Sequence, residues 1–445
     1  MGVLPGCTQV FSIEVESSTK ISDSEGNFLP DLNDNDQFGS AIARLGDLES
    51  DGVVDLAVGT PYDDTGGSDR GAVWILFMDD TGQVDTQRKL AHNLNGFAAA
   101  LDDNDHFGAS VAALGDLNGD GFLDLAVGAP GDDDGGADRG AIWILFLNFD
   151  GQVLSQQKIS DLDGGLVSAL QDGEQFGSAL ASIGDLNADG ITDLAVGSPF
   201  DDDGGANRGA IRVLFMNFDG TVQGEQKISF TAGGLAADLN DNDQFGSSVT
   251  AAGDIDKDGV IDLAVGAPGH DEGGSNRGAV WLLFMNTAGT VRDELKIAQS
   301  SGEFDGFLLD NDQFGSSLAD LGDLNEDGVN ELGVGAQYSD DGGMDRGAFW
   351  VLFLRKGGSV ISSSKISATA GNFGGALTDN SQFGSAIANV GDLDGNGVND
   401  IASGTRLDDD GGNDRGAVWI LFMAPPEPGE RVDPDTTFFS LLGGQ

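Results

Sequence analysis

The chain has 445 residues, and its 75 Asp and Glu against 21 Lys and Arg give a formal net charge of −54. A field of this sign repels nucleic acid and anionic membrane surfaces and attracts cations, so we expect no nucleic-acid partner. No apolar run approaches the roughly 18 residues of a membrane-spanning helix, so we expect no transmembrane span either. The 71 glycines are typical of short strands joined by tight turns.

The excess of acidic residues has two explanations. One is a solvated acidic surface of the halophilic type, and the other is acid concentrated in cation sites. Much of the acid lies in two clusters that recur along the chain, so we favour cation sites. The two explanations are compatible with each other.

Residues 1–9 are expected to form a flexible leader. They contain neither a basic region nor a long apolar stretch, so they are not an intact signal peptide. Residues 4–7 faintly resemble the end of a bacterial lipoprotein signal. Cys7 is the only cysteine, so no intramolecular disulfide can form.

The chain repeats itself six times with a period of 69 residues. Each copy opens with a Phe-Gly pair, and the phenylalanines are Phe38, Phe107, Phe176, Phe245, Phe314 and Phe383. A fixed period over most of a chain indicates one repeat architecture rather than a string of unrelated domains. No insertion or deletion separates the copies, so the contacts that join them tolerate little change in length.

The second copy shows how one repeat is predicted to fold. Residues 107–114 and 125–129 are small and apolar, and residues 139–147 are apolar on both faces, which predicts three buried strands. Residues 152–160 mix polar and apolar side chains and predict a fourth strand near solvent. No segment has the apolar stripe of a helix. Four such strands are typical of a propeller blade, which buries both faces only against neighbouring blades.

The two ends of the repeat region predict how the ring closes. The sixth copy ends after its third strand, residues 415–423, whereas residues 10–22 end in Lys-Ile-Ser like a fourth strand. If this amino-terminal strand completes the last blade, no open sheet edge remains. The predicted fold is therefore all-β, a six-bladed propeller with four antiparallel strands per blade over residues 10–424. Truncation from a longer open array is the alternative.

A polar loop between the first and second strands of each copy carries the chemistry of a cation site. In the second copy, acidic or amide side chains occupy positions 1, 3, 5 and 9, and Gly121 at position 6 permits a sharp turn. Calcium takes six to eight oxygen ligands, and the carbonyl of position 7 can add one; magnesium demands a stricter octahedron and keeps its waters. Six loops in phase predict about six bound Ca²⁺ rather than polar turns alone.

The predicted metal ligands, at positions 1, 3, 5, 7 and 9 of the six loops, are Asp47, Glu49, Asp51, Val53 and Asp55; Asp116, Asn118, Asp120, Phe122 and Asp124; Asp185, Asn187, Asp189, Ile191 and Asp193; Asp254, Asp256, Asp258, Val260 and Asp262; Asp323, Asn325, Asp327, Val329 and Glu331; and Asp392, Asp394, Asn396, Val398 and Asp400. Glu49 is longer than the usual ligand at its position, so the first loop is expected to bind most weakly. An EF-hand is excluded because Val127, at position 12 of the second loop, is not a bidentate Glu and no helices flank the loop.

Three elements of the second copy, Phe107-Gly108, the loop at 116–124 and Gly128-Ala129-Pro130, resemble the FG-GAP repeats of the integrin α-subunit β-propeller. The resemblance covers about residues 16–424. It implies calcium between the first two strands of a blade, on the face opposite the main ligand-binding face. Integrins have seven blades and a partner β-subunit, so their ligand specificity is not carried over, and repeats of bacterial and archaeal surface proteins fit better.

The Gly-Ala-Pro element is complete only in the second and fourth copies. In the first and third copies the alanine is replaced but the proline is kept. In the fifth and sixth copies the proline is replaced by Gln337 and Arg406.

Each copy also has an acidic Gly-Gly turn followed by Arg-Gly, such as residues 132–136 with Arg139. The first interpretation is a structural Arg–carboxylate pair that orders the loop or joins blades. The second is a further metal or ligand site, because six such turns in a ring would form a multivalent acidic face. The arginines are Arg70, Arg139, Arg208, Arg277, Arg346 and Arg415.

Catalysis has little support in the sequence. His92, His106 and His270 occupy non-equivalent positions, and no Ser-His-Asp or Cys-His set is suggested. The tryptophan that recurs in the third strand is more typical of a core than of a sugar platform, and Arg212 replaces it in the third copy.

The prediction is therefore a calcium-binding, non-enzymatic extracellular or cell-surface propeller that mediates adhesion or protein–protein interaction. Its protein or glycan ligand is expected on the face opposite the calcium loops. One alternative is a carbohydrate-active or other hydrolytic propeller. Another is a subunit of a surface array or filament that self-assembles through a Pro-rich tail or docking segment, residues 425–445, in which residues 438–442 are largely apolar.

Overall fold

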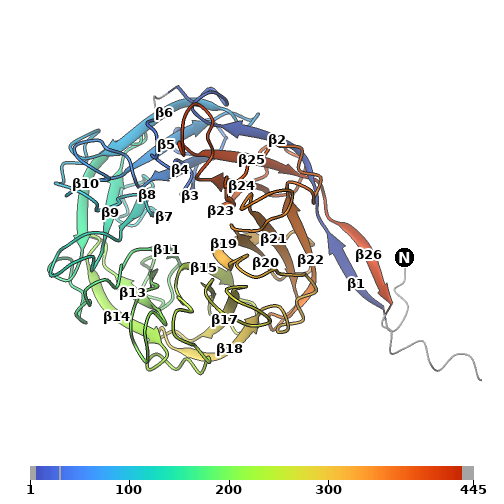
Figure 1. The fold of residues 1–445 in the computed structure, drawn as a ribbon. Coiled ribbons are helices and arrows are strands. Elements are labelled where there is room, and N and C mark those ends of the chain that lie inside the picture. Colours follow the sequence, from blue (N-terminus) through green and yellow to red (C-terminus); the bar gives the residue numbers. More distant parts are fainter. Residues whose placement is uncertain (1–6, 30–31, 433–445) are drawn as a thin grey trace, which may run out of the picture.

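The computed structural model describes residues 7–29 and 32–432 and forms a ring of six four-stranded antiparallel sheets (Figure 1). The predicted all-β, six-bladed propeller is thus confirmed. Every named element in the described ranges is a strand. Within those ranges there is accordingly no helix of the length and apolarity needed to cross a membrane.

Five blades are built from four consecutive strands each. The first contains β3 (Ala41–Gly46), β4 (Asp55–Thr60), β5 (Ala72–Met78) and β6 (Val84–Ala91). The second contains β7 (Ser110–Gly115), β8 (Asp124–Ala129), β9 (Ala141–Leu147) and β10 (Val153–Ile159). The third contains β11 (Ala179–Ser182), β12 (Leu194–Ser198), β13 (Ala210–Met216) and β14 (Val222–Ser229). The fourth contains β15 (Ser248–Gly253), β16 (Asp262–Ala267), β17 (Ala279–Met285) and β18 (Val291–Ile297), and the fifth contains β19 (Phe314–Gly322), β20 (Glu331–Ala336), β21 (Ala348–Leu354) and β22 (Val360–Ser367).

The sixth blade joins the two ends of the repeat region. It consists of β23 (Phe383–Gly391), β24 (Asp400–Thr405), β25 (Ala417–Met423) and, from the amino-terminal side, β2 (Val15–Ile21). β2 pairs antiparallel with β25, with Lys20 opposite Trp419. The predicted closure is confirmed, and the outer edge of β25 is covered.

The amino-terminal segment differs from the single strand that the sequence predicted. It is divided into β1 (Cys7–Ser12) and β2, and β1 pairs with β26 (Glu427–Val432) in a two-stranded ribbon that projects from the ring (Figure 1). The division arises because β1 lies against β22 of the fifth blade and not in the sixth blade; the backbone N–H of Phe11, in β1, donates to Ser362 Oγ at 3.0 Å. The expected leader and tail therefore each contribute a strand, while residues 1–6 and 433–445, with the apolar stretch 438–442, lie outside the described residues.

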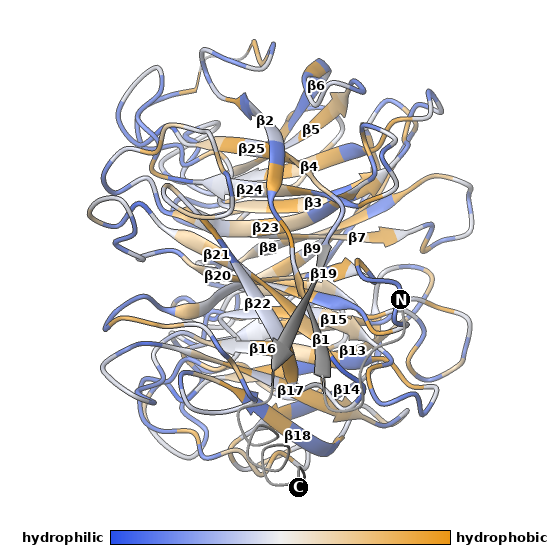
Figure 2. Cartoon of the chain, turned by 90° about the vertical axis from the view of Figure 1, so that its right-hand side faces the viewer, coloured by the Kyte–Doolittle hydropathy of each residue, from blue (hydrophilic) through white to orange (hydrophobic). Residues whose placement is uncertain are grey.

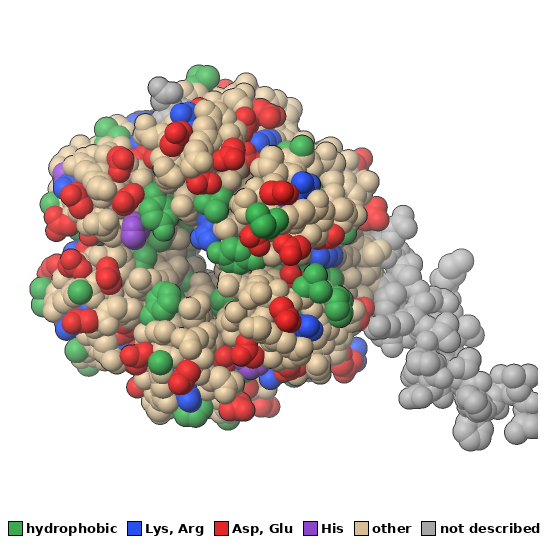
Figure 3. All heavy atoms as spheres, in the orientation of Figure 1, with side chains coloured by type: hydrophobic (Ala, Val, Ile, Leu, Met, Phe, Trp, Pro, Cys, Tyr) green, Lys and Arg blue, Asp and Glu red, His purple; other side chains and the backbone are tan. Residues whose placement is uncertain are grey.

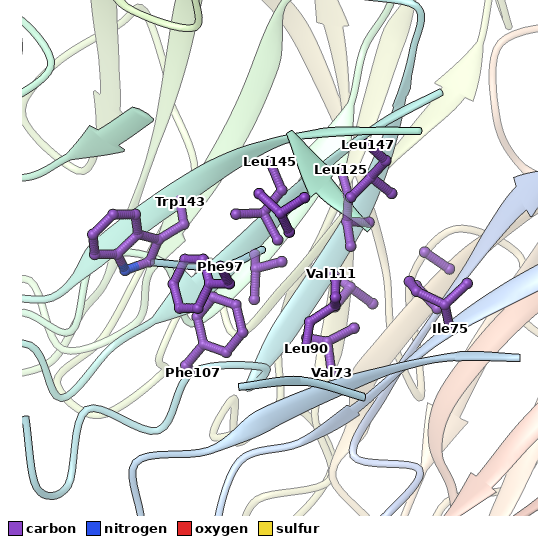
Figure 4. Close-up of a cluster of buried hydrophobic side chains, with 14 of the residues drawn as sticks. Val73, Ile75, Leu90, Phe97, Phe107, Val111, Leu125, Trp143, Leu145 and Leu147 are labelled. Atoms are coloured by element: carbon purple, nitrogen blue, oxygen red, sulfur yellow. The ribbon is translucent and has the colours of Figure 1, made fainter. Parts of the chain in front are cut away.

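Six hydrophobic clusters form the core, one at each contact between neighbouring blades. Apolar colour follows the strands, and polar colour follows the loops at both ends of the blades (Figure 2). Between the first two blades, Phe97 stacks on Phe107 at a centroid distance of 4.8 Å and meets Trp143 edge-on at 5.3 Å (Figure 4). The recurring tryptophan is thus a core residue, as predicted.

The Phe-Gly and Arg-Gly pairs join successive blades. Phe107, which has no exposed surface, forms a parallel backbone bridge to Gly71 of the preceding blade. A Cβ at Gly71 would lie 2.1 Å from the Phe107 carbonyl oxygen, and Gly108 has a φ of +96° with similarly close backbone neighbours. Because backbone meets backbone at this seam, only glycine fits, and a change in repeat length would separate the two partners.

Candidate metal centre

The six predicted calcium loops all lie at one end of the ring, because each joins the first strand of a blade to the second. We call this end the calcium-loop face and the other end, which carries the turns after the second strands, the opposite face. The glycine at position 6 has a φ between +87° and +96° in every loop, and a Cβ there would meet nothing within 4 Å. The glycine is therefore required for the turn and not for space.

Side-chain oxygens at positions 1 and 5 organise each loop internally; position 5 is an aspartate in five loops and Asn396 in the sixth. In the second loop, Asp116 accepts hydrogen bonds from the backbone N–H groups of Asp120 at 2.9 Å and Gly121 at 2.8 Å. Asp120 accepts one from the N–H of Phe122 at 2.9 Å. The other five loops keep the bonds from position 6 to position 1 and from position 7 to position 5. The loops are therefore tightly wound, with their acidic groups on the inside of the turn.

The carboxylate at position 9 anchors the loop to the blade. Asp124 has no exposed surface and accepts hydrogen bonds from the N–H groups of Leu117 at 2.9 Å and Leu147 at 3.3 Å, at the end of β9. Burial raises the pKa of Asp124 to about 6, and it does the same to the equivalent aspartates, Asp55, Asp193, Asp262 and Asp400. Burial raises the pKa of Glu331 to about 8. Position 9 thus has a structural task in addition to the predicted ligand role.

The structure brings three carboxylates together in two of the loops. Oxygen atoms of Asp254, Asp256 and Asp262 all lie within 4.8 Å of one another, and so do those of Asp392, Asp394 and Asp400. This concentration of hard oxygen donors, next to a wound turn, fits a calcium ion. The residues that would hold it are those at positions 1, 3, 5 and 9, and the ion would supply positive charge that offsets repulsion between the carboxylates.

The remaining loops differ at position 3. The second and third loops have Asn118 and Asn187 there, and each donates from Nδ2 to the position-5 aspartate at 3.0 Å. In the fifth loop Asn325 donates to Glu331 at 3.1 Å instead. Glu49 of the first loop is exposed and belongs to no such carboxylate triad within the described residues. The ligand sets of all six loops, and the carbonyl ligands at position 7, stay predictions.

Arg292, a residue of β18, contacts the fourth loop and was missed by the sequence analysis. It projects from β18 into the fourth loop, where its guanidinium pairs with Asp256 and, at 3.1 Å, with Asp258. The signal was present in the repeat alignment, because the other five copies have no basic residue at this register. The fourth loop therefore already contains a cation of the protein's own.

The acidic turns of the opposite face are largely occupied by lysines of the fourth strands. Lys158 pairs with Asp132 at 2.6 Å and with Asp134 at 2.7 Å, and Asp132 is 4% exposed. The equivalent lysine pairs with an acid of the same turn in every blade. One acid of each turn is exposed, and it accepts a hydrogen bond from its own loop. The acidic side chains of this face are therefore less free to bind a metal or a ligand than the sequence suggested.

The arginine that recurs in each copy does join neighbouring blades, but its partner there is not an acid of the Asp-rich turn. Arg139 Nε donates to Asp172 at 2.7 Å, and Asp172 lies in the segment that leads into the third blade. Four of the other five arginines pair in the same way with the aspartate 33 residues later in the sequence. Arg415, in the last copy, pairs with Asp34 across the ring closure. The structural interpretation of these arginines is thus supported. Each arginine pairs with an acid of the next linker, and not with the acid of the Asp-rich turn as expected.

The histidines do not converge on a catalytic set. His270 Nδ1 lies 3.0 Å from Asp243, and its ring meets Trp281 edge-on in the core. His106 packs against Tyr62, and burial lowers its pKa.

Comparison with known proteins agrees with this geometry. Residues 38–76, 107–145, 176–214 and 245–283 match the family described as FG-GAP repeat. Integrin alpha-5 of Xenopus laevis is 32% identical over 249 residues, which cover 54% of this chain and 20% of that protein. Integrin alpha-3 of Mus musculus is 31% identical over 252 residues, covering 57% and 21%. Integrin alpha-PS5 of Drosophila melanogaster is 38% identical over 168 residues, covering 38% and 15%.

The fold, the loops and these matches define an FG-GAP repeat β-propeller. The chain is an FG-GAP protein whose propeller resembles that of integrin α-subunits. The matched region spans about a fifth or less of these relatives. Among solved structures, BBS1N in complex with ARL6DN and soaked with lead aligns over 93% of this chain and 98% of that chain at 10% identity, with a TM-score of 0.42, which is too low to bear on function.

Proposed function

We propose that this chain is a calcium-binding, non-enzymatic propeller, located outside the cell or on its surface, that mediates adhesion or protein–protein interaction. The observation that carries the proposal is the set of six equivalent acidic loops, two of which hold three carboxylates within 4.8 Å. The similarity to integrin α-subunits supports the interaction role. The expected number of ions stays at about six, one for each loop.

Calcium in this role stabilises the fold instead of taking part in a reaction. The loops lie between buried strands, and position 9 ties each loop to the third strand of its blade. An ion that binds only the folded state raises the free energy of unfolding by about 2.7 kcal/mol per site at a hundredfold excess over the dissociation constant. The propeller over residues 10–424 would then be a rigid platform with its interaction surface on the opposite face.

The partner is proposed to be a protein or glycan bound on that opposite face, away from the calcium loops. Its Lys–carboxylate pairs hold the turns in place, so the surface offers ordered loops rather than free acid. Self-assembly through the tail, residues 425–445, remains a second proposal. The observation that favours it is the β1–β26 ribbon, whose backbone edges project from the ring (Figure 1).

Calcium titration tests the proposal directly. We expect isothermal titration of the chelator-treated protein to report up to six ions, and EGTA to lower the melting temperature at moderate salt. Asp254→Asn combined with Asp256→Asn should remove one site, whereas Asp293→Asn, on the exposed side of β18, should leave the stoichiometry unchanged. Identical melting curves with calcium and with EGTA would contradict the proposal, and a curve that responds to salt alone would favour the halophilic explanation.

A further inference from the structure

The axis of the ring contains a hollow whose chemistry differs from that of the rest of the molecule. In the view of Figure 3, acidic side chains spread over the blades, while the rim of the central hollow is mainly hydrophobic or uncharged. A cavity of about 520 Å³ occupies the axis at the opposite face, lined by the first residues of the inner strands and by the turns after the second strands. None of its lining residues is Asp, Glu or Lys, although the chain carries 75 acidic residues.

The floor of this cavity is apolar. One aliphatic residue from each inner strand faces the axis, and the same six residues line the second axial cavity, of about 450 Å³, toward the calcium-loop face. These residues are Ile42, Val111, Leu180, Val249, Leu318 and Ile387. The axis is therefore constricted by an aliphatic ring, with a polar chamber above it on the opposite face.

One wall of the chamber breaks the repeat symmetry. Arg406 and Gln337, from the sixth and fifth blades, stand where the first four copies have proline, and both line the cavity. Tyr338, half-buried, lies beside Gln337 and also lines the cavity. Polar groups that converge on one side of an otherwise small-residue pocket are characteristic of ligand sites.

Among the described residues, Arg406 is the only charged residue in the lining and has no acidic partner. Its Nε donates to Gln382 Oε1 at 2.7 Å, which orients the guanidinium, and no ion pair engages it within the described ranges. In a protein with more than three acidic residues for every basic one, an unpaired and half-buried arginine is unusual. Its two terminal nitrogens form the fork that binds a carboxylate with two parallel hydrogen bonds.

We infer that the axial chamber of the opposite face binds a carboxylate-bearing sugar, such as a uronic acid residue of a glycan. Arg406 takes the carboxylate, while Gln337 and the chamber serines take hydroxyl groups. The half-exposed rings of Tyr338 and Phe200, on the fifth and third blades, supply apolar faces at the rim. An acidic peptide would use the same arginine, but it does not need the many hydroxyl and amide groups of the wall. The inference deepens the proposed function by naming a ligand class for that face.

Saturation-transfer NMR with sodium D-glucuronate and D-galacturonate tests the inference on the full chain. We expect transfer to a uronate, with glucose and acetate each at least about tenfold weaker because each lacks one half of the recognition. Arg406→Gln should weaken uronate binding by a similar factor. Arg406→Pro should do the same in a variant that folds, because proline is the residue of four equivalent blades. Arg44→Gln is the matched control, since Arg44 is exposed and lines the axial cavity at the calcium-loop face.

The inference is overturned if neither uronate binds, if acetate or an acidic peptide binds as well as the uronates, or if Arg406→Gln binds them like the parent chain. Circular dichroism of each variant shows that the propeller is intact. The calcium titration measures binding at the calcium-loop face of the ring and does not involve Arg406. Failure of the sugar test would therefore not contradict the proposed calcium binding. Failure of the calcium test would not contradict uronate binding in the axial chamber.

Discussion

The guanidinium of Arg212 and the carboxylate of Glu174 form an ion pair inside the third blade, and each residue is 1% exposed. The other five blades have tryptophan at the first position, and none has glutamate at the second. Arg212 Nη1 also donates to Ser198 Oγ at 3.1 Å. The third blade has thus exchanged an aromatic contact for a buried charge pair, and the two changes make sense only together.

Removing one partner of this ion pair should lower the free energy of unfolding more than replacing both partners. Glu174→Gln leaves a buried guanidinium without its carboxylate, so we expect the free energy of unfolding to fall by about 3–5 kcal/mol. The combined variant Leu166→Phe, Glu174→Asp and Arg212→Trp restores the residues of the second blade at all three positions, and it should lose much less. Urea denaturation measures both. Equal losses in the two variants would show that the pair is not a coupled unit.

Removal of β2 should open the ring. Val15 and Ile21 are 1% and 0% exposed, and burial of two such side chains contributes about 3–5 kcal/mol. We expect a chain that lacks residues 1–21 to melt at a lower temperature and to aggregate through the exposed edge of β25. A chain that lacks only residues 1–14 keeps β2 and is the control. If the two truncated chains melt together, closure by β2 does not stabilise the ring.

Arg292 should weaken calcium binding at the fourth loop, because its guanidinium pairs with two of the proposed ligands. Arg292→Gln is expected to tighten one calcium site about tenfold, since the ion no longer displaces a resident cation. Isothermal titration measures the change, and adding Asp256→Asn should cancel it. Arg355→Gln removes an arginine of similar exposure that pairs with Glu303 outside the loops, and it should change nothing.

Lys158 should matter for stability rather than for partner binding. It lies between Asp132 and Asp134 and over the ring of Trp143, 5.5 Å from the centroid. Lys158→Met leaves two neighbouring carboxylates without their cation, so we expect a loss of about 3 kcal/mol in the free energy of unfolding. Lys356→Met, at an exposed position, is the control. If Lys158→Met leaves the free energy of unfolding unchanged, the Asp-rich turns do not need this lysine, and their carboxylates are free to bind a partner.

Asp36 and Asp105 should make stability fall as the pH rises. Burial raises the pKa of each from 3.8 to about 7. Between these values the unfolded chain has lost the proton and the folded chain has kept it, so the free energy of unfolding decreases with increasing pH. Asp36→Asn with Asp105→Asn should therefore flatten the stability profile between about pH 4 and pH 7, relative to the parent chain. Asp80→Asn, at an exposed site, is the control, and profiles that stay parallel would contradict the assignment.

The properties that repeat along the chain could be predicted from the residues alone. The period of Phe38, Phe107 and their equivalents indicated the number of blades, and the orphan strand ending at Ser22 indicated how the ring closes. The spacing of acidic residues around Gly121 and the other position-6 glycines indicated the candidate loops. These features are local, because one 69-residue copy contains the residues of a blade and its loop. Each copy can also be compared with the other five.

The pairing of charged side chains, in contrast, could be seen only in the folded ring. Arg139 pairs with Asp172, in the next linker, and Arg415 pairs with Asp34, at the other end of the chain. Packing of β1 on β22 divided the expected amino-terminal strand, and the ring placed Arg406 in an axial chamber without acidic residues. These relationships depend on the rotation from blade to blade and on the curvature that closes the ring. Neither quantity is contained in the spacing of residues within one repeat.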